Sequence, residues 1–179
     1  GLGDIPTIGE LEYENFLKTG DEGFEWIRPK DEWQAISLNY TSGTTGNPKG
    51  VVYHHRGSYL MSMGSVSAWN MPNRLTYLYT VPMFHCNGWG YPWTLAMLHA
   101  RVVFIRNIIV KEIFDLIDQY KVTHFGGAPI VLNMIANAPT EDQKALKNKV
   151  YVMTAGAPPP SSILLKMESL GFEVMHVYG

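Results

Sequence analysis

"RVVFIRNIIVKEIFDLIDQYKVTHFGG" (residues 101–127) contains the pattern that decides the fold. Its two ends, 101–105 and 122–127, are short and rich in β-branched and aromatic residues, which is typical of strands. The middle, 110–121, predicts an amphipathic helix whose apolar side carries Ile113, Phe114, Leu116, Ile117 and Tyr120. A strand, a helix and a second strand at this spacing predict a unit with two parallel strands.

The same alternation extends in both directions along the chain. Further strands are predicted at 35–41, 75–81, 149–156 and 172–179, and further helices at 56–69, 90–100, 129–138 and 160–171. We therefore expect an α/β fold with a mainly parallel sheet flanked by helices. Residues 1–33 are less regular and are predicted to be a partial lead-in segment, whereas residues 34–179 form one partial domain.

Composition excludes several classes of protein. The chain has 179 residues, of which 46% are hydrophobic and 17% charged, with a net charge of −2 and no basic stripe, which argues against nucleic-acid binding. No apolar run approaches the roughly 18 residues of a membrane span. Cys86 is the one cysteine, so no internal disulfide can form, and this favours a cytoplasmic location.

The loop "YTSGTTGNPKG" (40–50) is rich in glycine and hydroxyl groups. Glycine N–H groups, hydroxyls and the charge of Lys49 are the donors that a polyphosphate needs, so the loop is predicted to cradle a nucleotide. It differs from the Walker loop, because Asn47 and Pro48 separate Gly46 from the lysine, and no GxGxxG is present. A flexible surface loop is the alternative interpretation.

Three further stretches follow this loop in order: "VPMFHCNGW" (81–89), "TAGAPPP" (154–160) and "HVYG" (176–179). Together they resemble the core motifs of the adenylate-forming (AMP-binding) superfamily. Within it, the chain most resembles fatty acyl-CoA synthetases of the short- and medium-chain group, including methylthio-propionate CoA ligases and plant acyl-activating enzymes. The resemblance implies a fragment of the large N-terminal domain of such an enzyme, without the C-terminal domain.

The resemblance also implies roles for individual residues. His85 and Trp89 would contact the acyl substrate, on one face if their segment is helical. The residues implied in ATP binding are Thr41, Ser42, Gly43, Thr44, Thr45, Gly46, Lys49, Gly156, Ala157, Pro158, Tyr178 and Gly179. The implied reaction joins a small carboxylic acid to AMP and then to CoA, with ATP and Mg²⁺ as cofactors and CoA as co-substrate.

The family's Mg²⁺ glutamate and catalytic lysine are expected beyond Gly179, so we expect no catalytic or metal-binding residue in this chain and no activity from it alone. The resemblance is compatible with a homodimer. Two other functions stay open: a nucleotide-binding module without turnover, and a Ser- or Cys-dependent acyl hydrolase. The second would need a G-x-S-x-G elbow, and Ser42 lacks its first glycine. Cys86 is expected to pack rather than to act as a nucleophile.

Overall fold

The computed structural model describes residues 9–41 and 46–178. The chain divides into two compact units, residues 1–30 and 31–179. In the first unit, α1 (Tyr13–Leu17) buries none of its residues. The division lies close to the predicted boundary after residue 33, and the assignment of 1–33 and 34–179 to a lead-in and a domain stays a prediction.

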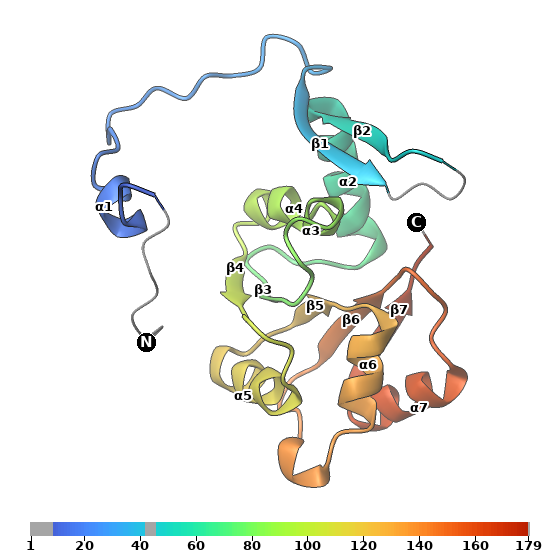
Figure 1. The fold of residues 1–179 in the computed structure, drawn as a ribbon. Helices are drawn as coiled ribbons and strands as arrows, with labels where there is room; N and C mark the ends of the chain where they lie inside the picture. The colour runs from blue at the N-terminus through green and yellow to red at the C-terminus, as the bar shows by residue number, and fades with distance from the viewer. Residues whose placement is uncertain (1–8, 42–45, 179) are drawn as a thin grey trace. The chain divides into compact units, whose positions relative to one another are not determined.

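A five-stranded sheet forms the centre of the second unit (Figure 1). Its strands lie in the order β4-β3-β5-β6-β7, and every neighbouring pair is parallel. The bounds are β3 (Thr76–Tyr79), β4 (Arg101–Phe104), β5 (His124–Gly126), β6 (Val150–Thr154) and β7 (Phe172–His176). The predicted α/β fold with a mainly parallel sheet is confirmed.

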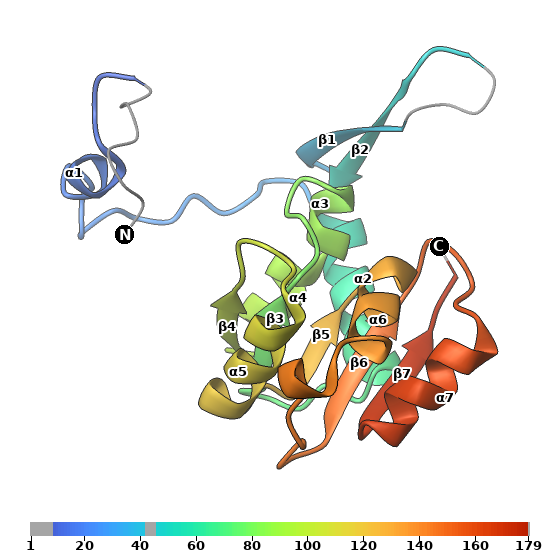
Figure 2. The same ribbon diagram turned by 60° about the horizontal axis from the view of Figure 1, so that its bottom comes forward.

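Helices cover both faces of this sheet, as a parallel sheet requires (Figure 2). The helices on one face are α5 (Val110–Tyr120), α6 (Pro129–Ala136) and α7 (Ser161–Ser169). The opposite face packs against the end of α2 (His55–Ala68) and against α4 (Tyr91–Met97). Side chains alternate along β3: Leu78 packs in the core between the sheet and α5, α6 and α7, whereas Tyr77 and Tyr79 pack in the core on the opposite face.

An antiparallel hairpin, β1 (Ala35–Thr41) and β2 (Lys49–His54), lies apart from the sheet. The strand at 35–41 was predicted, but β2 was not, and it includes Lys49, which the sequence analysis placed in a loop. The apolar side of β1 is the more exposed one: Leu38 and Tyr40 are 56% and 69% exposed, whereas Ser37 and Asn39 are half-buried. The polar side of β1 therefore faces the rest of its unit.

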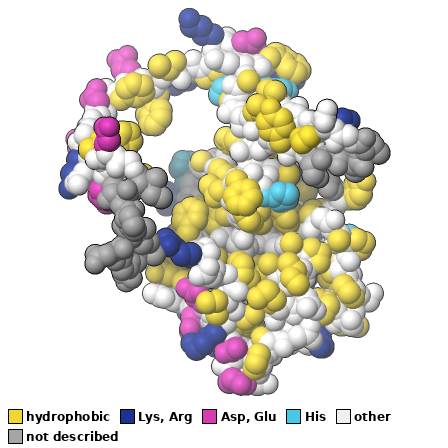
Figure 3. All heavy atoms as spheres, in the orientation of Figure 1, with side chains coloured by type: hydrophobic (Ala, Val, Ile, Leu, Met, Phe, Trp, Pro, Cys, Tyr) yellow, Lys and Arg dark blue, Asp and Glu magenta, His cyan; other side chains and the backbone are white. Residues whose placement is uncertain are grey.

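The surface of the second unit combines apolar and charged areas. Exposed apolar side chains include Ile130 and Met134 on α6 and Leu165 on α7. Figure 3 shows acidic and basic side chains close together at the lower end of one face. Within residues 9–41 and 46–178, no helix is both long and apolar enough to cross a membrane.

Candidate functional site

The carboxyl ends of β3 and β5 mark the place where the strand order reverses. From β3 the chain runs outward to β4, returns past β3 to β5, and then continues to β6 and β7. Ligands of open α/β sheets bind at such a switch point. Here Thr80 Oγ1 donates a hydrogen bond to the carbonyl of Gly126, and Gly127 N donates to Met153 O at 2.8 Å. These bonds connect the residue after β3 to the end of β5, and the residue after β5 to β6.

Between β3 and α4 the chain makes an unusual turn, α3 (Cys86–Trp89). Every residue from Cys86 to Gly90 has a positive φ, between 43° and 73°, so the turn is left-handed. Tyr79 Oη donates a hydrogen bond to Gly88 O at 2.9 Å. Burial raises the pKa of Tyr79 to about 12, so this phenol keeps its proton at neutral pH.

The turn places Trp89 between the sheet and an apolar pocket. A Cβ on Gly126 would lie 3.3 Å from ring atoms of Trp89, so the indole lies against the end of β5. Trp89 also lines a pocket of about 420 Å³. The other lining residues are Val52, Tyr53, His54, Gly57, Ser58, Met61, Cys86, Gly90 and Trp93. The pocket is mostly apolar, which suits a hydrocarbon group.

Of the two residues predicted to contact an acyl group, only one lines the pocket. Trp89 lines the pocket, whereas His85 is exposed at the start of α3 and does not line it. The helical spacing that would bring both side chains to one face does not apply, because the turn is left-handed. The expectation that Cys86 packs in the core was wrong: its side chain is exposed and borders the pocket. The substrate roles of His85 and Trp89 stay predictions.

Three of the predicted phosphate-binding residues, Thr41, Gly46 and Lys49, lie at the open end of the hairpin. Thr41 pairs with Lys49 in the ladder, and both are exposed, as is Gly46. A Cβ on Gly46 would meet no other atom within 4 Å, so the backbone is accessible there. Ser42, Gly43, Thr44 and Thr45 lie outside the described residues.

The other residues implied in ATP binding come after β6 and β7 in the sequence. Gly156, Ala157 and Pro158 are exposed, and Gly156 has a φ of +93° with open space beside it. Tyr178 is fully exposed, and Gly179 lies outside the described residues. The binding roles of all these residues stay predictions.

Sequence reasoning missed two hydroxyls at strand ends. Thr154 is fully buried at the end of β6, and its Oγ1 has no hydrogen-bond partner among the described residues. Thr80 directly follows β3 and bonds to Gly126. A threonine at the end of a strand, before a glycine- and proline-bearing loop, is the signal that could have identified Thr154.

The described residues do not fit a magnesium ion. None of their His, Cys, Asp and Glu side chains form a group of three that could hold a metal. Mg²⁺ prefers carboxylate and water oxygens in octahedral geometry, and no such carboxylates lie beside the pocket.

The family model for AMP-binding enzymes matches residues 6–179. The chain belongs to the AMP-binding enzyme family. Among curated relatives of this AMP-binding chain, an Arabidopsis thaliana protein named acetate/butyrate–CoA ligase AAE7, peroxisomal, is 54% identical over 96% of the chain and 30% of its own length. A Humulus lupulus protein named acetate–CoA ligase CCL3 is 51% identical, again over 96% of this chain and 30% of the relative.

Solved structures agree with the family assignment. The N-terminal domain of FACL13 from Mycobacterium tuberculosis is 27% identical with a TM-score of 0.73, covering 79% of this chain and 36% of that one. A luciferase-like enzyme from Zophobas morio is 25% identical with a TM-score of 0.76, covering 89% of this chain and 38% of the enzyme. The chain therefore spans about a third of the length of the relatives that it matches.

Proposed function

We propose that this chain supplies the nucleotide-binding hairpin and the acyl pocket of an ATP-dependent acyl-CoA ligase. The carboxylate of an acid would attack the α-phosphorus of ATP, forming acyl-AMP and releasing pyrophosphate. The thiol of CoA would then displace AMP and give the thioester. The observation that carries this proposal is the apolar pocket lined by Trp89, whose ring also lies against the carboxyl end of β5.

The hairpin end would hold the triphosphate. Lys49 is exposed beside Thr41, where its ammonium group can approach a phosphate without prior desolvation. Backbone N–H groups near Gly46 would add uncharged donors. Such an arrangement neutralises charge on the leaving pyrophosphate, and charge stabilisation with positioning accounts for most catalysis of this kind.

The pocket would hold the hydrocarbon part of the acid. Its volume of about 420 Å³ lies toward the small end of the range for small-molecule sites, roughly 300–1,000 Å³. The relatives are named for acetate, butyrate and 2-methylpropanoate. A short- to medium-chain carboxylic acid is therefore the proposed substrate class.

Nucleotide binding can be tested on the chain itself. Isothermal titration with ATP should show binding that Lys49→Met weakens about tenfold or more, because a charge-assisted hydrogen bond is lost. Lys111→Met is the matched control, since Lys111 lies on α5 and pairs with Asp115 instead. Equal affinity in both variants would count against the phosphate role of the hairpin.

Turnover assays test whether the chain needs further residues for catalysis. With ATP, magnesium and acids of two to eight carbons, the isolated chain should release no pyrophosphate, because its described residues provide no Mg²⁺ ligand set. Replacing the matching segment of a curated ligase relative with this chain should retain acyl-CoA formation, and Trp89→Ala in that chimera should reduce it. Turnover by the isolated chain would show that the proposed need for further residues is wrong.

No specific observation favours the alternative of a Cys-dependent hydrolase. Among the described residues, no hydrogen bond joins Cys86 to a histidine that could activate it. We also propose a cytoplasmic location and a homodimer, both expected from the sequence, and size-exclusion chromatography with light scattering tests the second.

A further inference from the structure

The apolar pocket has two walls that come from separate parts of the chain. One wall is β2, through Val52, Tyr53 and His54. The facing wall includes the left-handed turn, through Cys86 and Trp89. The distance between hairpin and turn therefore sets the width of the pocket.

A single side chain joins the two walls. Ser37 Oγ and Asn39 Nδ2, both on β1, donate hydrogen bonds to Oδ1 of Asn87, each at 2.7 Å. Because the two donors are two residues apart, they lie on the same side of β1, which is the half-buried side. β1 and α3 lie side by side in both ribbon views (Figures 1 and 2). β1 in turn is paired with β2 along its length, so the two bonds connect the turn to the opposite wall.

The turn needs such support, because its backbone is strained. Cys86, Asn87 and Trp89 all have a positive φ, which costs L-residues about 1–2 kcal/mol each. Strained conformations of this kind persist only where their surroundings hold them in place. Asn87 is well suited to its position, since asparagine tolerates this region better than most residues.

We propose that Asn87 is a positioning residue that fixes the width of the acyl pocket. By accepting from Ser37 and Asn39, it holds the turn that carries Trp89 at a set distance from the hairpin. The pocket consequently admits groups up to a defined size. The identity of the occupant as an acyl group rests on the proposed function, whereas the role of Asn87 in setting the width does not.

Cys86 provides the test, because it is the chain's one cysteine, is exposed and borders the pocket. Labelling rates would be measured for a small reagent, N-ethylmaleimide, and for a bulky apolar one, N-(1-pyrenyl)maleimide. The ratio of the two rates reports the space around the thiol and cancels changes in its ionisation, since both reagents attack the thiolate.

Asn87→Gly removes both bonds but keeps the positive φ accessible, and it should raise the relative rate of the bulky reagent about fivefold. Asn87→Asp retains Oδ1 as the acceptor and should restore the original ratio. The matched control is Asn70→Gly, because Asn70 is exposed, has a φ of 47° and does not line the pocket; its ratio should not change.

If Asn87→Gly does not fold, the double variant Ser37→Ala with Asn39→Ala removes the donors from the other side and should give the same rise. An unchanged ratio in the variants that lose the bonds would overturn the proposal, and so would an equal rise in Asn87→Asp. These outcomes do not depend on ATP or on any acid, so a failure here is distinct from a failure of the proposed ligase function.

Discussion

At the scale of single residues, Gly88 occupies a position that excludes every side chain. A Cβ at this residue would lie 2.1 Å from Tyr79 Oη, and its φ is +58°. Gly88→Ala should therefore lower the free energy of unfolding by about 2–3 kcal/mol, measured by urea denaturation.

Gly64 provides the control for this substitution. It lies in α2, is exposed, and a Cβ there would meet no atom within 4 Å. Gly64→Ala should stabilise the protein by about 0.5–1 kcal/mol, because alanine has the higher helix propensity. Equal effects of the two alanines would contradict the steric argument for Gly88.

His124 makes stability depend on pH. It is 1% exposed, packed between Trp69 and Tyr151, and burial lowers its pKa from 6.5 to about 4. Between these values the unfolded chain binds a proton that the folded chain does not, so stability falls as pH drops from 6.5 toward 4. The loss should approach about 3 kcal/mol.

Denaturation at pH 7 and pH 4.5 checks this prediction. His124→Phe keeps a ring in the aromatic cluster but cannot titrate, so it should lose less stability on acidification than the wild type does. If the free energy of unfolding falls equally in both proteins, the pH dependence comes from carboxylates and not from His124.

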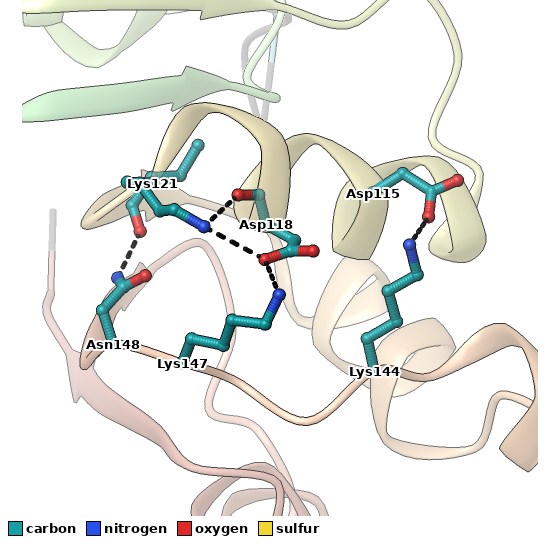
Figure 4. Close-up of polar contacts among 7 residues, drawn as sticks. Asp115, Asp118, Lys121, Lys144, Lys147 and Asn148 are labelled. Atoms are coloured by element: carbon teal, nitrogen blue, oxygen red, sulfur yellow. Dashed lines mark hydrogen bonds and ion pairs between the residues drawn. The ribbon is translucent and has the colours of Figure 1, made fainter.

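At the scale of elements, α5 is attached by two different kinds of contact. On its exposed side, Asp118 pairs with Lys121 and Lys147, and Asp115 pairs with Lys144 (Figure 4). Lys111 also pairs with Asp115. These hydrogen bonds from lysines hold the pKa of both carboxyls below its usual value. The buried side of α5 includes Ile113, Phe114 and Ile117, which are almost fully enclosed.

The apolar side should dominate the stability of this element. Ile117→Ala should cost about 2–5 kcal/mol, because it removes a fully buried side chain. Asp118→Asn should leave the free energy of unfolding nearly unchanged, since the ion pairs are exposed and screened. Denaturation in low and in 1 M salt measures both effects, and a large, salt-sensitive loss in Asp118→Asn would contradict this ranking.

The elements also show what sequence patterns can predict. The sheet strands and α5 follow the alternation of apolar residues closely, because burial on one or both faces dictates that alternation. The turn at Cys86–Trp89 could not be predicted, because its left-handed backbone depends on Tyr79 and on two side chains about 50 residues earlier. For the same reason the exposure of Cys86 was missed, whereas the contact of Trp89 with a pocket was expected from the family's motif.

At the scale of the whole molecule, the second unit should not need the first for its stability. All described residues from 9 to 30 are exposed, whereas the ion pair of Glu32 with Arg56 and the ring contact of Trp33 with His54 lie within the second unit. Deleting residues 1–30 should change the free energy of unfolding by no more than about 0.5 kcal/mol. Thermal and urea unfolding of both forms measures this, and a shift of several degrees would show that the segment contributes.

The bonds to Asn87 have a consequence for synthesis on the ribosome. Ser37 precedes Asn87 by 50 residues, and chains elongate at about 5–20 residues per second. Both donors on β1 are therefore synthesised several seconds before their acceptor, and until Asn87 reaches them water must solvate the polar side of β1. Chains released from the ribosome before Asn87 is added should expose Ser37 and Asn39 to proteases that the finished protein resists.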